Sequence, residues 1–220
     1  MHKKKIIVLM MASIPCQAMA IDYELSAGQT FFKQTINGTW YQNAFPYTVD
    51  LKSVNWSTGL SHKFSDYPRI RAEFVNLGIA SADALAVPID AYYNTNTNQC
   101  VGECLPLARF VSKGGVRGVA LTIAPEKRFG DFSVFIEGGI YIFRPTYSAV
   151  VTNVRWTHEA DPITVYTKHN TTTQISYVMG LGVRYKQVEF VARYYDVEAS
   201  DDNVPAVYIG ATTVSVRFKF

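Results

Sequence analysis

Few side chains in this 220-residue sequence have the types and spacing that catalysis requires. The chain has four histidines, and an enzyme that cleaves an ester or amide would need one of them beside a serine and a carboxylate, which together activate the nucleophile. His158 precedes Glu159. His169 precedes Asn170 and Thr171, and neither histidine has a His-x-Ser pairing. We therefore expect no catalytic site, no enzymatic activity and no cofactor.

Cys100 and Cys104 are the candidate redox or metal-binding pair, with three residues between them in a polar stretch. In an oxidising compartment they would form one small disulfide. Such a short loop removes little entropy from the unfolded chain, so the bridge would shape a loop tip. Free thiols or a metal are the alternatives, but a metal needs further ligands nearby. The acidic stretch 196–202 is better interpreted as a solvated loop tip than as a cation site.

The first twenty residues have the pattern of a secretory signal peptide. Three lysines, Lys3, Lys4 and Lys5, precede an apolar stretch over 6–14, and a small-x-small cleavage site ends at Ala20. The apolar run is about half of the ~20 residues that a membrane-spanning helix needs. Removal of this leader leaves equal numbers of basic and acidic residues, so no nucleic-acid partner is expected. The remaining chain, 21–220, is predicted to be one domain.

Apolar and polar residues alternate with a period of two in eight segments of that domain, which is typical of strands with one apolar face. In segment 132–142, for example, Phe132, Val134 and Ile136 alternate with Ser133 and Glu137. A change of phase inside segment 69–79, between positions 74 and 75, suggests a β-bulge. Gly180 and Gly182 lie within a segment and lack the spacing of a phosphate-binding loop. The eight segments are 23–33, 54–64, 69–79, 116–124, 132–142, 174–186, 188–197 and 208–220.

The connections between these segments alternate between long and short. We expect long connections at about 34–53, 80–115, 144–173 and 198–206, and short ones at about 65–68, 125–131 and 187. Transmembrane barrels of the outer-membrane type have short periplasmic turns and long extracellular loops. Segments of about 9–13 residues also suit tilted strands that cross a membrane, whereas strands in soluble proteins average about five or six residues. The sequence therefore predicts an all-β, eight-stranded antiparallel up-and-down transmembrane barrel.

Charged residues in the segments fall mostly on the less apolar face, which we assign to the barrel interior. An arginine facing lipid near the bilayer centre would cost about 2–4 kcal/mol. The bore of an eight-stranded barrel is narrow enough for side chains to fill it. We expect an internal network of ion pairs and hydrogen bonds, with a proton or ion pathway as the alternative. The predicted network consists of Arg69, Arg71, Glu73, Glu137, Arg184, Glu189, Arg193 and Arg217.

Aromatic residues near the ends of the segments, Tyr208 among them, fit two girdles at the membrane interfaces. The last segment also alternates apolar residues up to an aromatic one, Phe220. With the export signal, the eight segments and the loop order, the chain resembles the small outer-membrane β-barrel proteins of Gram-negative bacteria, of the OmpA transmembrane and OmpX/Ail/Opa type. The resemblance covers the whole of 21–220 and is one of pattern.

This resemblance implies a monomer in the bacterial outer membrane, in contact with outer-membrane lipid and lipopolysaccharide. It also implies assembly by the barrel assembly machinery. That machinery reads the end of the last strand in this family. The positions implied as the assembly signal are Val214, Val216, Phe218 and Phe220.

The first function hypothesis is a structural and surface-interaction role, in which the long loops bind a host or surface ligand. Aromatic side chains in such loops make adaptable contacts, although they can also pack the loops together. A narrow porin-like channel for small solutes is the alternative, and a lipid-modifying enzyme is a third. The candidate ligand-contact residues are Tyr92, Tyr93, Tyr147, Trp156 and Tyr166.

Overall fold

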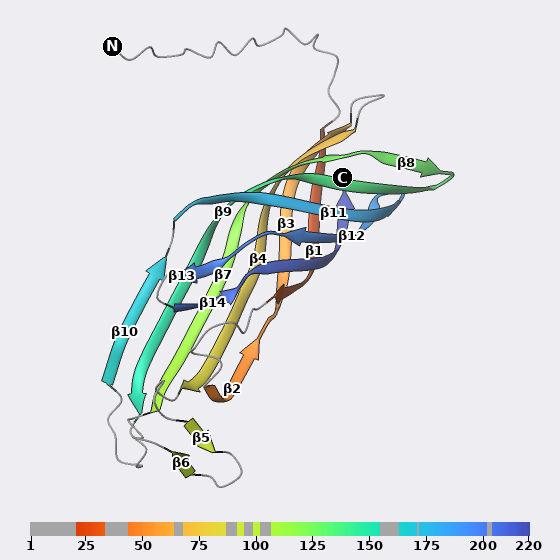
Figure 1. Cartoon of the computed structure of the whole chain (residues 1–220). Helices are drawn as coiled ribbons and strands as arrows, with labels where there is room; N and C mark the ends of the chain where they lie inside the picture. Colours follow the sequence, from red (N-terminus) through yellow and green to blue (C-terminus); the bar gives the residue numbers. More distant parts are fainter. Residues whose placement is uncertain are drawn as a thin grey trace, which may run out of the picture.

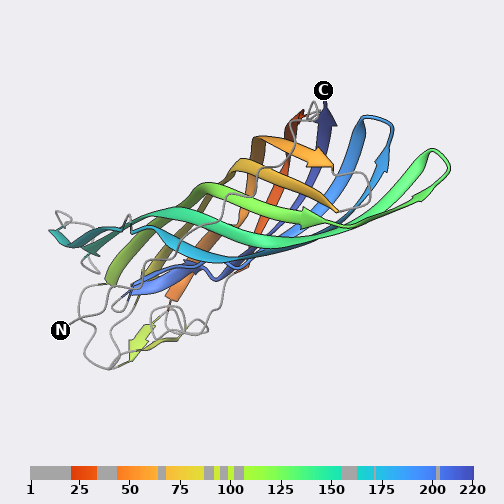
Figure 2. The same ribbon diagram turned by 90° about the horizontal axis from the view of Figure 1, so that it is seen from above.

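The computed structural model is a closed antiparallel β-barrel (Figures 1 and 2). It describes residues 21–33, 44–63, 68–86, 92–94, 99–101, 107–154, 163–170, 172–201 and 204–220. Within these ranges there is no helix, and hence no helix that could span a membrane. The barrel strands are β1 (Ile21–Lys33), β3 (Lys52–Lys63), β4 (Arg69–Ala86), β7 (Leu107–Ala124), β9 (Phe132–Val154), β11 (Gln174–Tyr185), β12 (Val188–Tyr195) and β15 (Gly210–Lys219).

The sheet closes into a barrel because β1, the first strand, pairs with another strand on each of its two edges. One edge of β1 pairs with β3, with Ala27 opposite Trp56, and the other pairs with β15, with Ala27 opposite Val216. Backbone hydrogen bonds continue to the end of this seam, where the Phe220 N–H donates to the Tyr23 carbonyl over 2.9 Å. Each remaining barrel strand pairs antiparallel with its neighbour in the chain. The predicted fold class is confirmed.

Alternation of the side chains sorts them between the two faces of the barrel. In β9, Val134 and Ile136 point outward, while Ser133, Phe135 and Glu137 are buried inside. In β11 the outward Leu181 is 62% exposed, and its neighbour Gly182 lies inside. An apolar band therefore surrounds the barrel, as the period-two pattern predicts.

Several strands are longer than predicted and continue past the apolar band. β4 and β7 each have 18 residues and β9 has 23. Their ends form a protruding sheet with β2 (Ala44–Asp50) beside β4 and β10 (Ile163–Asn170) beside β9 (Figure 1). The predicted long connections 34–53, 80–115 and 144–173 are therefore partly wrong, because the hydrogen-bonded ladder continues where the outward face turns polar. We call this five-stranded region, formed by β2, β10 and the adjoining ends of β4, β7 and β9, the outer sheet.

The predicted bulge in β4 exists, but it lies further along the strand. The register with β7 shifts between Asn76 and Gly78, and Gly78 has φ +86°. The side-chain Oδ1 of Asn76 accepts the Gly78 N–H over 2.9 Å. The position predicted from the sequence was wrong because the apolar Val75 and Leu77 point into the interior, whereas the prediction assigned the apolar residues of this segment to the outward face.

The remaining elements are short hairpin strands at the two ends of the barrel. β8 (Glu126–Phe129) pairs with the start of β9 at the short-turn end, through a turn in which Gly130 has φ +61°. At the other end, β13 (Ala199–Asp201) pairs with β14 (Val204–Tyr208), and β5 (Tyr92–Asn94) pairs with β6 (Gln99–Val101).

Candidate functional site

The barrel interior contains a buried cluster of opposite charges, which we call the charge network. Its members come from six strands, and the inward positions of those strands bring them together. Every side chain in it is at most 10% exposed. Positive and negative charges are equal in number, as a low-dielectric interior demands. The charge network consists of Arg71, Arg184, Arg193, Arg217, Glu24, Glu73, Glu137 and Glu189.

Arg71 from β4 lies at the centre of the charge network and is fully buried. Its Nε is 3.2 Å from Glu24 Oε2, and its Nη1 is 3.0 Å from Glu137 Oε2. Its Nη2 contacts both carboxylate oxygens of Glu189. The guanidinium also lies 5.0 Å from the ring centre of Phe135, within the range of a cation–π interaction. One arginine thus joins strands β1, β9 and β12 to β4.

Two further arginines complete the centre of the network. Arg193 donates from Nε to Glu137 and from Nη2 to Glu73. Its Nη1 donates to the Tyr195 hydroxyl over 3.2 Å. Arg217 Nη1 is 2.7 Å from Glu189 Oε2, and its Nε is 3.3 Å from Glu73 Oε1. Each of these carboxylates therefore has at least two cationic neighbours.

The network continues toward the short-turn end of the barrel. Arg184 Nε lies 2.6 Å from Glu189 Oε1, and its Nη1 pairs with Glu126 in β8. Glu126 also pairs with Lys63 at the end of β3. A separate group lies near the β1–β15 seam, where Asp22 pairs with Arg69 and with Lys219, each at 2.7 Å.

The structure places all eight residues of the predicted lumen network inside the barrel. Seven of them meet in the charge network, whereas Arg69 pairs with Asp22 and Ser61 instead. Glu24, Asp22 and Glu126 were not among the predicted residues. Counting would have indicated that acidic residues were missing: the predicted set had five arginines and only three glutamates, an imbalance that a buried cluster does not tolerate.

An aromatic layer fills the lumen between the charge network and the outer sheet. Tyr141 stacks on Phe143 at 5.3 Å between ring centres and meets Tyr195 edge-on at 5.0 Å. Phe32 packs against Tyr208 at 4.8 Å. We call these five residues the aromatic layer. The Tyr141 and Tyr208 hydroxyls donate to the backbone carbonyls of Val75 and Gly115, each over 3.2 Å, so their polar ends are satisfied without water.

Two aromatic residues lie elsewhere than their predicted positions. Tyr208 was expected at a membrane interface, but it is fully buried, because it enters the lumen just before β15. Tyr147 was expected in an exposed loop; it is only 2% exposed and lies in β9, on the inner side of the outer sheet. β9 is longer than predicted, so its inward-facing positions continue beyond residue 144, where the loop was predicted to begin.

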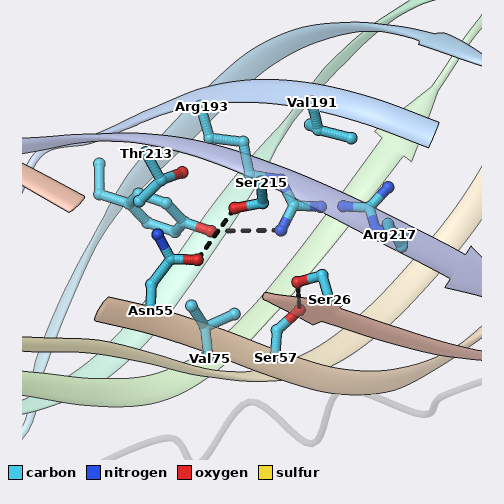
Figure 3. A pocket seen from close by; sticks show the side chains of 10 residues that line it. Ser26, Asn55, Ser57, Val75, Val191, Arg193, Thr213, Ser215 and Arg217 are labelled. Atoms are coloured by element: carbon cyan, nitrogen blue, oxygen red, sulfur yellow. Dashed lines mark hydrogen bonds between the residues drawn. The ribbon is translucent and has the colours of Figure 1, made fainter. Parts of the chain in front are cut away.

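A small polar pocket lies beside the charge network (Figure 3). The hydroxyls of Ser26 and Ser57 share one hydrogen bond of 2.6 Å, and Ser215 donates to the Asn55 Oδ1 over 2.9 Å. Its volume of about 10 Å³ is at the lower limit for one water molecule. Within the described part of the chain, no group of His, Cys, Asp and Glu could hold a metal ion. This pocket therefore has space for about one water beside the ion pairs.

The other predicted site residues fall into two groups. In β15, Val214 and Phe218 face outward and Val216 is half-buried; Phe220 is 69% exposed. Cys104 and Trp156 lie outside the described residues. For Cys100, Tyr92, Tyr93 and Tyr166 the structure describes the backbone strands alone, so the disulfide and the ligand-contact residues stay predictions.

Comparisons with known proteins found little similarity in sequence. No family model matches the chain, and no curated protein matches it. A search of solved structures found Ail, the attachment invasion locus protein of Yersinia pestis, in a crystal structure with the heparin analogue sucrose octasulfate. The two chains are 10% identical, the match covers 92% of this chain and 100% of Ail, and the TM-score is 0.39. Such a distant similarity carries no argument about function; the fold itself follows from the strand pairings, which make the chain a closed eight-stranded antiparallel β-barrel.

Proposed function

We propose that the protein is an integral outer-membrane β-barrel that anchors a surface-interaction region outside the cell. One observation carries the membrane assignment: the barrel has an apolar exterior and a charged interior, the reverse of a soluble barrel. Ile136, Ile175 and Leu181 are 64%, 70% and 62% exposed, whereas Arg71 and Glu189 are fully buried. In water this arrangement would expose a continuous apolar surface, which soluble monomers avoid.

The direction of the barrel in the membrane follows from its two ends. Phe220 and the hairpins at 130–131 and 186–187 lie at one end, and the outer sheet lies at the other (Figure 1). In outer-membrane barrels, short turns face the periplasm and long connections face the outside. We therefore assign the outer sheet to the cell exterior. Export would use residues 1–20 as a signal peptide, which leaves 21–220 as the outer-membrane domain.

The outer sheet supports the surface-interaction part of the proposal. It extends β4, β7 and β9 beyond the apolar band and adds β2 and β10 at its sides. Ordered backbone hydrogen bonds therefore reach well away from the apolar band, and Tyr166 belongs to β10 of this sheet. Such a platform can hold a non-enzymatic binding surface for a host or surface ligand.

Two experiments test the proposal at its two levels. The barrel assignment predicts that the mature protein, folded in detergent, migrates differently on a gel before and after boiling. Identical migration, or a monomer that stays dissolved without detergent, would contradict it. For the surface role, cells with the protein should adhere to a ligand surface on which cells with the Trp156→Ala/Tyr166→Ala variant adhere less. Unchanged adhesion to every surface tested would remove the binding role and leave the barrel assignment intact.

A further inference from the structure

Three neighbouring strands change their backbone character at one level, where the barrel ends and the outer sheet begins. β4 has its bulge there, with Gly78 opposite Val116 of β7. Val116 follows Gly114 and Gly115, and it lies opposite Pro145 of β9. A glycine weakens the interior of a strand, a bulge bends it, and a proline lacks the N–H group that a ladder needs. Each strand that enters the outer sheet from the barrel therefore has a weak point beside that of its neighbour.

The pairing of these strands with their outer neighbours is interrupted at the same level. On one side, β9 pairs with β11 as far as Phe143 and with β10 from Tyr147, so Pro145 lies between the two ladders. On the other side, β4 pairs with β3 as far as Asn76 and with β2 from Ser81. β4, β7 and β9 are thus the strands that join the described part of the outer sheet to the barrel. We call their segments 76–81, 113–117 and 143–147 the waist.

A hairpin from the other wall of the barrel supports the waist from the lumen side. β13 and β14 connect β12 to β15, and β14 packs against β4 and β7 (Figure 1). Val207 and Tyr208 of β14 are fully buried, in one apolar cluster with Leu77 at the bulge and Ala80 beyond it. The Tyr208 hydroxyl donates to the Gly115 carbonyl over 3.2 Å, at the waist itself. The hairpin therefore holds the outer sheet in its present direction.

We propose that the waist is a hinge, and that the β13–β14 hairpin is a brace whose release lets the outer sheet swing as one body relative to the barrel. This inference rests on the proposed surface role, because the swing changes the direction in which the outer sheet presents a binding surface. Hinges absorb such a movement in a few residues. A ligand that binds one direction of the sheet more tightly shifts the two populations toward it. The hinge thus regulates the proposed surface.

Two tyrosine variants separate the brace from the rest of the lumen. Tyr208→Phe keeps the ring and removes the hydroxyl that reaches the waist, and the Gly115 carbonyl keeps another donor, the Thr146 hydroxyl at 3.4 Å. Tyr141→Phe is the matched control. The buried Tyr141 hydroxyl also donates to a backbone carbonyl over 3.2 Å, but to that of Val75, on the barrel side of the waist. Heat-modifiable migration of each variant verifies that the barrel is folded.

Double electron–electron resonance between two spin labels measures the swing in the mature protein in lipid nanodiscs. The labels are attached at Val150→Cys on the outer sheet and Val214→Cys on β15, after Cys100 and Cys104 are replaced by serine. A rise of about 3.3 Å per residue places the first label about 17 Å from residue 145 of the waist, so a swing of about 20° moves it by about 6 Å. A second pair, Val134→Cys/Val214→Cys, lies wholly in the barrel and reports any distortion there.

Without a tyrosine change, we expect a main distance and a minor second distance for the label pair that crosses the waist. Tyr208→Phe should raise the minor population roughly two- to tenfold, the effect of one lost hydrogen bond, while Tyr141→Phe leaves it unchanged. One unchanged distance with and without Tyr208→Phe would overturn the hinge. Equal changes in both tyrosine variants, or a change in the barrel pair, would overturn it as well. These distances need no ligand, so a failed adhesion test leaves the hinge standing, and a rigid waist leaves the surface role standing.

Discussion

Arg71 Nη2 lies 3.0 Å from one carboxylate oxygen of Glu189 and 2.9 Å from the other, although the two residues are 118 positions apart. The contact crosses the lumen from β4 to β12, and both side chains are fully buried. It therefore ties together walls of the barrel that share no backbone hydrogen bond. The charge network therefore stabilises the closed barrel through side-chain contacts across the lumen, in addition to the backbone hydrogen bonds between paired strands.

Replacement of Arg71 by methionine should strongly destabilise the barrel. Glu24, Glu137 and Glu189 would each lose a cation, and removal of one partner from a buried ion pair costs about 3–5 kcal/mol. We expect the free energy of unfolding to fall by roughly this amount, measured by urea titration in lipid vesicles with tryptophan fluorescence. Arg128→Met, at an exposed position, should change it by no more than about 0.5 kcal/mol. Similar effects for the two variants would show that the network does not stabilise the fold.

Adjacent glycines in β9 offer a second test. A Cβ at Gly139 would lie 1.9 Å from the Leu121 carbonyl oxygen of the neighbouring strand, whereas a Cβ at Gly138 would meet nothing within 4 Å. Gly139→Ala should therefore lower the free energy of unfolding by about 1–3 kcal/mol, the usual cost of overpacking. Gly138→Ala should leave it unchanged or raise it slightly, because it removes backbone freedom from the unfolded chain. The same unfolding titration distinguishes them, and equal stabilities would contradict the close approach of β7 and β9.

The protein should not conduct ions in planar bilayers. The aromatic layer of Phe32, Tyr141, Phe143, Tyr195 and Tyr208 fills the lumen, and the polar pocket beside the charge network holds about one water. Recordings at both polarities should therefore contain no reproducible single-channel steps. Steps of constant size, absent from a preparation of the boiled protein, would favour the porin-like alternative.

Phe220→Ala should reduce assembly in cells more than folding in vitro. Phe220 is exposed, and its ring lies 6.4 Å from that of Tyr23 at the β1–β15 seam. The family resemblance assigns this residue to recognition by the assembly machinery, whereas its few contacts give it a small part in stability. We expect less heat-modifiable protein in isolated outer membranes and near-normal refolding into vesicles. Phe132→Ala, at another exposed aromatic of the short-turn end, serves as the control; an equal loss in both would remove the special role of Phe220.

The barrel strands could be predicted from the sequence because their outward face carries an apolar residue at every second position, as in 132–142 and 174–186. The outer sheet could not be predicted, because strands such as β2 and β10 lie beyond the apolar band and do not need an apolar residue at every second position. The bulge at Gly78 was misplaced because Val75 and Leu77 fill the interior, and alternation alone does not distinguish an apolar lumen from lipid. Glu24 was not predicted because its arginine partners lie on other strands. Only the register between the strands shows which charged residues meet inside the barrel.

The seam between β1 and β15 joins the first and last strands described, with Glu24 opposite Lys219. The free edges of β1 and β15 cannot pair with each other until both strands of this chain have been made. A half-made molecule would present two unpaired edges and an apolar exterior, both of which promote aggregation. If the protein is the outer-membrane barrel proposed above, this topology would require escort across the periplasm and closure only at the membrane.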